Sequence, residues 1–131
     1  MARVAYLDSS AIVKLIVPEA ESEALRAWLA ERPLRATSAI ARTEVMRAIR
    51  PEGSDAIAAA RAIFLAVDLV SVSDSIMEAA AMLPPTTLRT LDAIHLATAV
   101  SIGEDLGAVV TYDHRMVEGA TKLGLPTASP S

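Results

Sequence analysis

The sequence contains no cysteine, and this absence narrows the chemistry open to the chain. Without cysteine there is no disulfide, no thiolate nucleophile and no cysteine-ligated zinc or iron–sulfur centre. A bound metal would therefore need oxygen or imidazole ligands, and the chain has only two histidines. Aromatic residues make up just 3% of the sequence, so platforms on which nucleic-acid bases could stack are scarce.

Long hydrophobic runs and a strong excess of charge are also missing. The first residues, MARVAYLD, hold an apolar run that is too short for a signal peptide or a membrane span. We therefore expect a soluble, cytoplasmic protein without a membrane partner, a location that the lack of cysteine also suits. The net charge of −4 argues against a surface that is basic throughout, but it is compatible with a basic rim around an acidic site.

The chain has 131 residues, of which 53% are apolar, so we expect one domain spanning 1–131 with a sizeable core. Short apolar segments predict strands at 3–7, 34–37, 69–72, 108–111 and 125–128. Amphipathic segments with capping residues predict a first helix that is capped by Ser9 or Ser10 and ends at residue 17. They predict further helices at 19–32, 39–49, 54–66, 74–83, 90 to about 107, and 113–123. This alternation predicts an α/β fold, in which helices cover both faces of a parallel sheet.

Four carboxylates attract attention because of where the predicted elements place them. Asp8 follows the first strand and Asp113 follows the strand at 108–111, and ligands of open parallel sheets bind beyond the carboxyl ends of strands. Glu44 and Asp92 lie on helices that can direct them to the same edge. Each also has an ordinary explanation: Asp8 and Asp113 suit helix caps, Asp92 complements a helix dipole, and Glu44 suits a solvated surface.

If the four carboxylates converge, they need a counter-ion. Like charges close together repel, raise one another's pKa values and require a cation to remain ionised. Oxygen ligands favour a hard ion such as Mg²⁺ or Mn²⁺, with coordination positions left for water and a substrate phosphate. Such a site can deprotonate water and stabilise the charge of a phosphodiester during in-line hydrolysis.

Several segments carry a resemblance to a known family. The stretches YLDSSAIVKL, SAIARTEVMRAIR, LRTLDAIHLATA and VVTYDHRMVEGATKLGL resemble those of PIN-domain ribonucleases, and within them the VapC toxins of VapBC toxin–antitoxin pairs. The resemblance covers nearly the whole chain in the family's order. It implies a three-layer α/β/α, Rossmann-like domain whose five parallel strands have the order 3-2-1-4-5.

The resemblance also implies the site. Asp8, Glu44, Asp92 and Asp113 match the family's catalytic, metal-binding acidic quartet, and Ser10 and Thr111 match small hydroxyl positions around it. These hydroxyls suit either support of the quartet or a turn and cap. The sequence departs from the family's pattern two positions after Asp113. Many PIN domains carry a further acid there, where this chain has Arg115, so the resemblance leaves open whether the site holds one metal ion or two.

The activity implied is that of a Mg²⁺- or Mn²⁺-dependent endoribonuclease toxin. It would hydrolyse phosphodiester bonds of structured or single-stranded RNA, such as tRNA or rRNA loops, and would be inhibited by a VapB-type antitoxin. The family also implies a homodimer. Arg47, Arg89 and Arg115 are candidates for contacts with RNA phosphates, while Arg47 is equally compatible with an intramolecular ion pair.

Three alternatives remain at this point. His95 and His114 could act as acid and base in a metal-free reaction that uses the 2′-hydroxyl of RNA, or serve as structural groups. Lys14 and the acids invite comparison with receiver domains, but the paired acids that receivers carry after their first strand are missing, and Lys14 suits an exposed helix face. A PIN-like module that binds RNA or protein without cleaving is the remaining alternative function.

Overall fold

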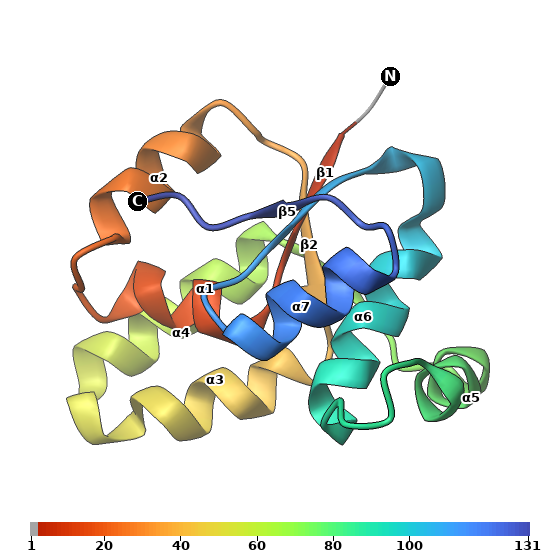
Figure 1. Ribbon diagram of the computed structural model, residues 1–131. Helices are drawn as coiled ribbons and strands as arrows, with labels where there is room; N and C mark the ends of the chain where they lie inside the picture. The colour runs from red at the N-terminus through yellow and green to blue at the C-terminus, as the bar shows by residue number, and fades with distance from the viewer. Residues whose placement is uncertain (1–2) are drawn as a thin grey trace.

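A computed structural model describes residues 3–131 and places a parallel sheet at the centre of the molecule (Figure 1). Its strands are β1 (Val4–Leu7), β2 (Arg35–Ser38), β3 (Asp68–Val70), β4 (Leu106–Val110) and β5 (Thr127–Ala128). The paired strands are all parallel and lie in the order β3-β2-β1-β4-β5. The predicted order 3-2-1-4-5 is therefore confirmed, and β1 occupies the middle of the sheet.

Helices cover both faces of this sheet. They are α1 (Ser9–Ile16), α2 (Ser22–Ala30), α3 (Ala41–Ile49), α4 (Ser54–Ala66), α5 (Asp74–Met82), α6 (Thr90–Ile102) and α7 (His114–Lys122), with short 3₁₀ turns η1 (Arg50–Glu52) and η2 (Gly103–Asp105). Buried side chains of α1 to α4 form one core on one face, and those of α5 to α7 form two clusters on the other. Figure 1 shows α1 to α4 to the left of the strands and α5 and α6 to the right. The three-layer α/β/α architecture is thus confirmed.

Successive side chains of strand β1 pack against the helices on opposite faces of the sheet. Ala5 and Leu7 are buried against α1 to α4, while Tyr6 is buried against α6 and α7. This is the alternation that a pleated strand imposes on successive residues. A polar phenol is thereby placed inside the core, on the face from which α6 carries Asp92.

The predicted helix from 90 to about 107 is too long. Helix α6 ends at Ile102, because Gly103 adopts a positive φ of 72° and caps it. Strand β4 then begins at Leu106, which pairs with Val4 of β1. Among residues 3–131, no helix is both long and apolar enough to cross a bilayer.

Close contact between α7 and α6 depends on Gly119. A Cβ at this position would lie 2.9 Å from Leu96 Cδ1 and 3.2 Å from Leu88 Cδ1. Because Leu96 is fully buried, it has little room to move away. Overpacking should therefore outweigh the better helix propensity of alanine in Gly119→Ala, giving a net loss of about 1 kcal/mol of unfolding free energy.

Urea denaturation measures this loss directly. The exposed neighbour Glu118 supplies a control, since Glu118→Ala should change the unfolding free energy by no more than about 0.5 kcal/mol. A Gly119→Ala protein as stable as the wild type would show that this contact is not tight.

Candidate active site

Asp8 lies where β1 meets α1, almost completely buried. Its Oδ1 accepts hydrogen bonds from Ser10 Oγ at 2.7 Å and from the Ala11 amide at 3.0 Å, and its Oδ2 accepts one from Thr111 Oγ1 at 2.5 Å. Burial raises the pKa of Asp8 above its ordinary value, although these hydrogen bonds oppose the shift. Asp8 is itself the N-cap of α1, so the predicted cap at Ser9 or Ser10 is wrong, and Asp8 combines a capping role with a place at the sheet edge.

Two hydroxyls join the ends of β1 and β4. Thr111 Oγ1 donates to Asp8 and accepts from the Asp113 amide at 3.0 Å. Ser10 Oγ donates to Asp8 and accepts from the Tyr112 amide at 3.0 Å. Both hydroxyls therefore orient Asp8 and fix the loop that carries Asp113.

Glu44 projects from α3, with its side chain only 23% exposed. Its Oε1 accepts a hydrogen bond from Ser9 Oγ at 2.7 Å and lies 2.7 Å from His95 Nε2. Burial by itself would raise the pKa of Glu44, but the hydrogen bonds from His95 and Ser9 outweigh it and lower the pKa. Glu44 is therefore not the freely solvated surface charge considered above, because two hydrogen bonds hold its half-buried carboxylate in a fixed direction.

Asp92 lies in the first turn of α6, and its buried Oδ2 has no hydrogen-bond partner among residues 3–131. Burial raises the pKa of Asp92, and the negative charges of Asp113, Asp8 and Glu44 add to that rise while His95 opposes it. Helix-dipole stabilisation applies to this position, but it leaves Oδ2 unpaired. A buried carboxylate oxygen without a partner is unfavourable, and it marks a place where a cation would be stabilised.

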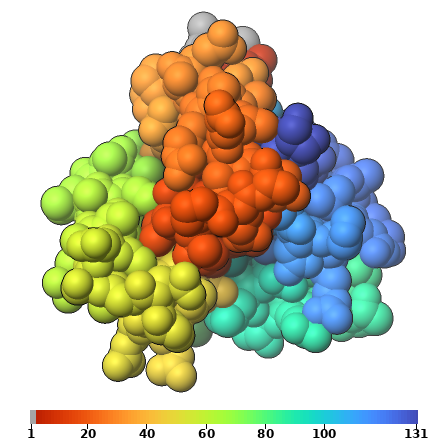
Figure 2. All heavy atoms as spheres, turned by 90° about the vertical axis from the view of Figure 1, so that its left-hand side faces the viewer, coloured from red at the N-terminus to blue at the C-terminus, as the bar shows by residue number. Residues whose placement is uncertain are grey.

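Asp113 completes the group at the start of α7. Its Oδ1 accepts a hydrogen bond from the Arg115 amide at 2.9 Å, so the capping explanation holds for it too. The four acids come from the end of β1, from α3, from α6 and from the loop after β4. Figure 2 shows the red-orange surface of α1 bordered by yellow at the lower left, teal at the lower right and blue on the right, the colours of α3, α6 and α7.

The donor set fits a hydrated hard cation. Among residues 3–131, no group of three or more acidic or histidine side chains is already closed around an ion-sized space. Mg²⁺ usually keeps several waters and binds through only one or two carboxylates, so it needs no such cage. Asp92 Oδ2 is free to bind it, and no hydrogen bond within residues 3–131 reaches Oε2 of Glu44.

Comparison with known proteins agrees with this geometry. The PIN domain matches this chain over residues 5–122. The chain belongs to the PIN-domain family. Ribonuclease VapC46 of Mycobacterium tuberculosis is 52% identical to it over 96% of this chain and 97% of the relative, and ribonuclease VapC47 of the same species is 39% identical over 95% and 96%. The resemblance to PIN-domain VapC proteins indicated by the sequence segments is therefore confirmed.

Solved structures share the fold of this PIN domain. VapC20 of M. tuberculosis, described as a sarcin–ricin loop cleaving toxin, superposes with a TM-score of 0.76 at 21% identity, over 97% of this chain and 99% of that one. A toxin–antitoxin complex from Klebsiella pneumoniae gives 0.73 at 23% identity, over 97% and 98%. At these identities the likeness concerns the fold alone.

The three arginines proposed to contact RNA are all exposed on the PIN domain. Arg47 lines a surface hollow of about 370 Å³ together with Arg50 and Pro51. Arg89 and Arg115 lie at the starts of the helices α6 and α7, near Asp92 and Asp113 in the sequence. No ion pair of these arginines occurs within residues 3–131, so the intramolecular pair considered for Arg47 is not formed there.

Lys14, predicted to extend from an exposed helix face, is instead largely buried. Its ammonium lies 3.1 Å from Glu19 Oε2, 2.7 Å from Glu21 Oε2 and 4.7 Å from the centre of the Tyr112 ring. Lys14 lines a surface hollow together with Ser9, Ser10 and Glu44 of the carboxylate site. Its ion pairs connect α1 to the segment that leads into α2.

Three polar side chains around the site, those of His95, Tyr6 and Ser9, differ in how readily the sequence indicates a role for them. His95, considered above as an acid–base or a structural group, contacts Glu44 and Tyr6. Tyr6 and Ser9 were not singled out, because Tyr6 lies in an apolar strand and Ser9 suited a cap. A tyrosine among small apolar residues in a buried strand was the available signal, since a buried phenol requires a polar partner.

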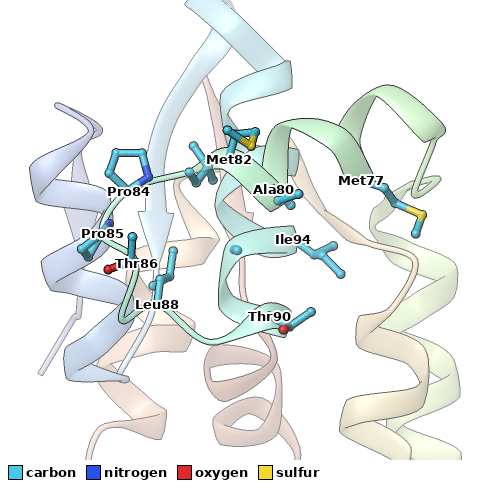
Figure 3. Close-up of a pocket in the computed structure, with 12 residues that line it drawn as sticks. Met77, Ala80, Met82, Pro84, Pro85, Thr86, Leu88, Thr90 and Ile94 are labelled. Atoms are coloured by element: carbon cyan, nitrogen blue, oxygen red, sulfur yellow. The ribbon is translucent and has the colours of Figure 1, made fainter.

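A second hollow lies between α5, the connection that follows it and the start of α6 (Figure 3). It measures about 480 Å³, and Met77, Met82, Leu88 and Ile94 contribute to its mostly apolar lining. No acidic or basic side chain lines it, so it offers no ligands for the chemistry of the carboxylate site.

Proposed function

We propose that this PIN domain is a Mg²⁺- or Mn²⁺-dependent endoribonuclease toxin of VapC type, acting in the cytoplasm. The observation that carries the proposal is Asp92 Oδ2, a buried oxygen without a partner in the field of three further carboxylates. The relatives named as ribonucleases support nuclease chemistry. We assign Asp8, Glu44, Asp92 and Asp113 as the acidic quartet.

The residues of the site divide the work among them. A bound Mg²⁺ or Mn²⁺ would supply an activated water and neutralise charge on the scissile phosphate. Asp92 and Glu44 would hold it through the oxygens that hydrogen bonds leave free. Ser10 and Thr111 orient Asp8, the Arg115 amide orients the carboxylate of Asp113, and both acids would add negative charge near the ion.

RNA would be held mainly through its backbone. The exposed guanidinium groups of Arg47, Arg89 and Arg115 would bind phosphates of the RNA backbone. Because aromatic residues are only 3% of the chain, we expect selection by RNA shape and phosphate position, as in tRNA or rRNA loops. Arg115 stands where many PIN domains carry an acid, which favours a single ion.

The metal-free histidine mechanism is less compatible with the geometry. His95 is 2% exposed, and its two ring nitrogens lie 2.6 Å from the Tyr6 hydroxyl and 2.7 Å from Glu44. It is therefore not free to exchange protons with RNA. His114 is exposed at the start of α7, and the other histidine in the sequence is the buried His95.

The chemistry of the product separates the mechanisms. Purified protein incubated with tRNA and rRNA in Mn²⁺ should leave 5′-phosphate and 3′-hydroxyl ends, and the same mixture with EDTA should show no fragments. Cyclic 2′,3′-phosphate ends would overturn hydrolysis by water in favour of the histidine mechanism. RNA that is bound tightly but never cut, across tRNA and rRNA, would favour the non-catalytic module.

We also propose a VapB-type antitoxin and a homodimer as partners. An inhibitor could place a guanidinium among the four carboxylates, where its charge would replace that of the metal. Mass measurement by light scattering at micromolar concentration tests the dimer, and a monomeric mass would reject it. Titration with a synthetic antitoxin segment, with and without its arginine, tests the mode of inhibition.

Thr111→Val should weaken metal binding without unfolding the protein. Valine nearly preserves the shape of threonine but removes the hydroxyl that donates to Asp8 and accepts from the Asp113 amide. Loss of a group that orients a ligand typically lowers metal affinity about 10- to 100-fold. Calorimetric titration with Mn²⁺ measures the change, and Thr121→Val, an exposed threonine on α7, serves as the control. Equal affinity in the Thr111 variant and the wild type would contradict the assignment.

A further inference from the structure

A chain of polar contacts runs from the middle of the sheet to the candidate site. The hydroxyl oxygen of Tyr6, on β1, lies 2.6 Å from His95 Nδ1. The other ring nitrogen of His95, Nε2, lies 2.7 Å from Glu44 Oε1. Tyr6 and His95 are almost fully buried, with ring centres 5.8 Å apart and planes at 71°. The contacts join β1, α6 and α3, which come from distant parts of the sequence.

We infer that Tyr6 and His95 are positioning residues that hold Glu44 by Oε1 so that its Oε2 faces the metal. The inference rests on the proposed function, and it extends that function to two residues that do not touch the substrate. Within residues 3–131, hydrogen bonds reach Oε1 of Glu44 from two sides and do not reach Oε2. A carboxylate fixed in this way presents its second oxygen in one direction.

The direction of each hydrogen bond follows from the donors available. The phenol of Tyr6 carries its proton at neutral pH, because the ordinary pKa of a tyrosine is about 10, and its oxygen lies 2.6 Å from His95 Nδ1. It can therefore donate to Nδ1 of His95, which leaves the ring proton on Nε2. That proton is donated to Glu44 Oε1, while Ser9 Oγ donates to the same oxygen at 2.7 Å.

A purely structural role explains the contact between Tyr6 and His95, but not the contact between His95 and Glu44. Two buried polar groups such as Tyr6 and His95 satisfy each other inside a core, as buried groups generally must. The second ring nitrogen, however, is directed at a partly exposed carboxylate rather than at the backbone. Metal-binding side chains are commonly oriented by outer hydrogen-bond partners of this kind.

The experiment measures Mn²⁺ affinity by calorimetry in four variants. His95→Leu removes the donor, and we expect affinity to fall about 10- to 100-fold. His95→Gln carries an amide N–H that can reach Oε1, so it should recover most of this loss. Tyr6→Phe keeps the ring volume and should show a smaller loss. Tyr112→Phe, which removes the phenol that donates to Pro130 O, should bind like the wild type.

Several outcomes would overturn the inference. Wild-type affinity in a folded His95→Leu protein would show that His95 only fills the core. If His95→Leu does not fold, the two remaining variants decide. If a folded His95→Gln protein loses Mn²⁺ affinity by the full roughly 10- to 100-fold expected without the donor, a hydrogen bond to Glu44 does not explain the role of His95. Wild-type Mn²⁺ affinity in Tyr6→Phe would likewise show that the hydrogen bond from Tyr6 is not needed. Circular dichroism and melting temperature establish folding in each case.

A second measurement needs no metal. The chain has only two histidines, so ¹⁵N spectra of the metal-free protein resolve the ring of His95 from that of exposed His114. We expect a proton on Nε2 and an unprotonated Nδ1 that accepts a hydrogen bond, and a shifted Nδ1 signal in Tyr6→Phe. A proton on Nδ1 would overturn the inference. If the wild-type protein fails to bind Mn²⁺, the metal dependence in the proposed function is wrong. The ¹⁵N spectra would still test the hydrogen bonds that join Tyr6, His95 and Glu44.

Discussion

Asp92→Asn is expected to abolish RNA cleavage while making the metal-free protein more stable. Asparagine keeps the shape of the side chain but removes the charge that a cation requires. Because even outer partners of metal ligands change activity about 10- to 100-fold, loss of the ligand itself should lower cleavage by more than about 100-fold. Gel analysis of RNA fragments at equal protein concentrations measures this loss.

The gain in stability follows from the sign of the pKa shift. Burial and the neighbouring carboxylates raise the pKa of Asp92 in the folded state, so its ionised form opposes folding. This opposition is complete above the folded pKa, and it fades as the pH falls through that value towards the ordinary aspartate pKa of about 3.9. Asp92→Asn should therefore melt at a higher temperature near neutral pH, and the difference from the wild type should shrink on acidification.

A matched control is available at Asp74. It is an exposed aspartate in the first turn of α5, as Asp92 is an aspartate in the first turn of α6. Asp74→Asn should change neither cleavage nor stability beyond the roughly 0.5 kcal/mol typical of surface substitutions. Full activity in Asp92→Asn, or equal loss in both variants, would contradict the role given to Asp92.

Binding of Mn²⁺ or Mg²⁺ should stabilise the folded protein strongly, and chelation should abolish cleavage reversibly. A ligand present at 100 times its dissociation constant adds about 2.7 kcal/mol of stability. For a domain of this size, such a gain corresponds to roughly 10 °C in melting temperature. Scanning calorimetry in EDTA and then in excess Mn²⁺ measures it, with cleavage followed in the same samples.

The same scan distinguishes a specific site from general screening. Added KCl at matched ionic strength should give a much smaller shift, and Asp92→Asn should lose most of the response to Mn²⁺. An equal response to K⁺, or an undiminished response in Asp92→Asn, would mean that screening of surface charge explains the effect.

Sequence patterns predicted the alternation of strands and helices and placed Asp8 and Asp113 after strands because these features depend on local signals, whereas the order 3-2-1-4-5 came only from the resemblance to PIN-domain ribonucleases. Asp8 and Asp113 directly follow buried strands, and a parallel sheet brings such positions to one edge. The end of α6 was missed because Gly103 stops the helix from within a stretch that continues to look helical as far as Gly107.

The contacts that orient the acids could not be predicted in the same way. Tyr6 and His95 are separated by 89 positions, and Thr111 and Asp8 by 103. Their partners are decided by which residues of β1, α6 and β4 face each other once the layers close. Sequence alone gives the chemical types of such groups, and packing decides the pairs.

The central position of β1 has a consequence for when activity can arise during synthesis. Asp8 precedes its hydrogen-bond partner Thr111 by 103 positions, Asp113 also comes after β4, and the Thr111 amide itself donates to Ala128 of β5. The carboxylate site thus draws on segments that are synthesised far apart in time. A nascent polypeptide on the ribosome would remain harmless to RNA until β4 has inserted beside β1. The topology itself therefore makes completion of the active site a late event in the synthesis of the chain.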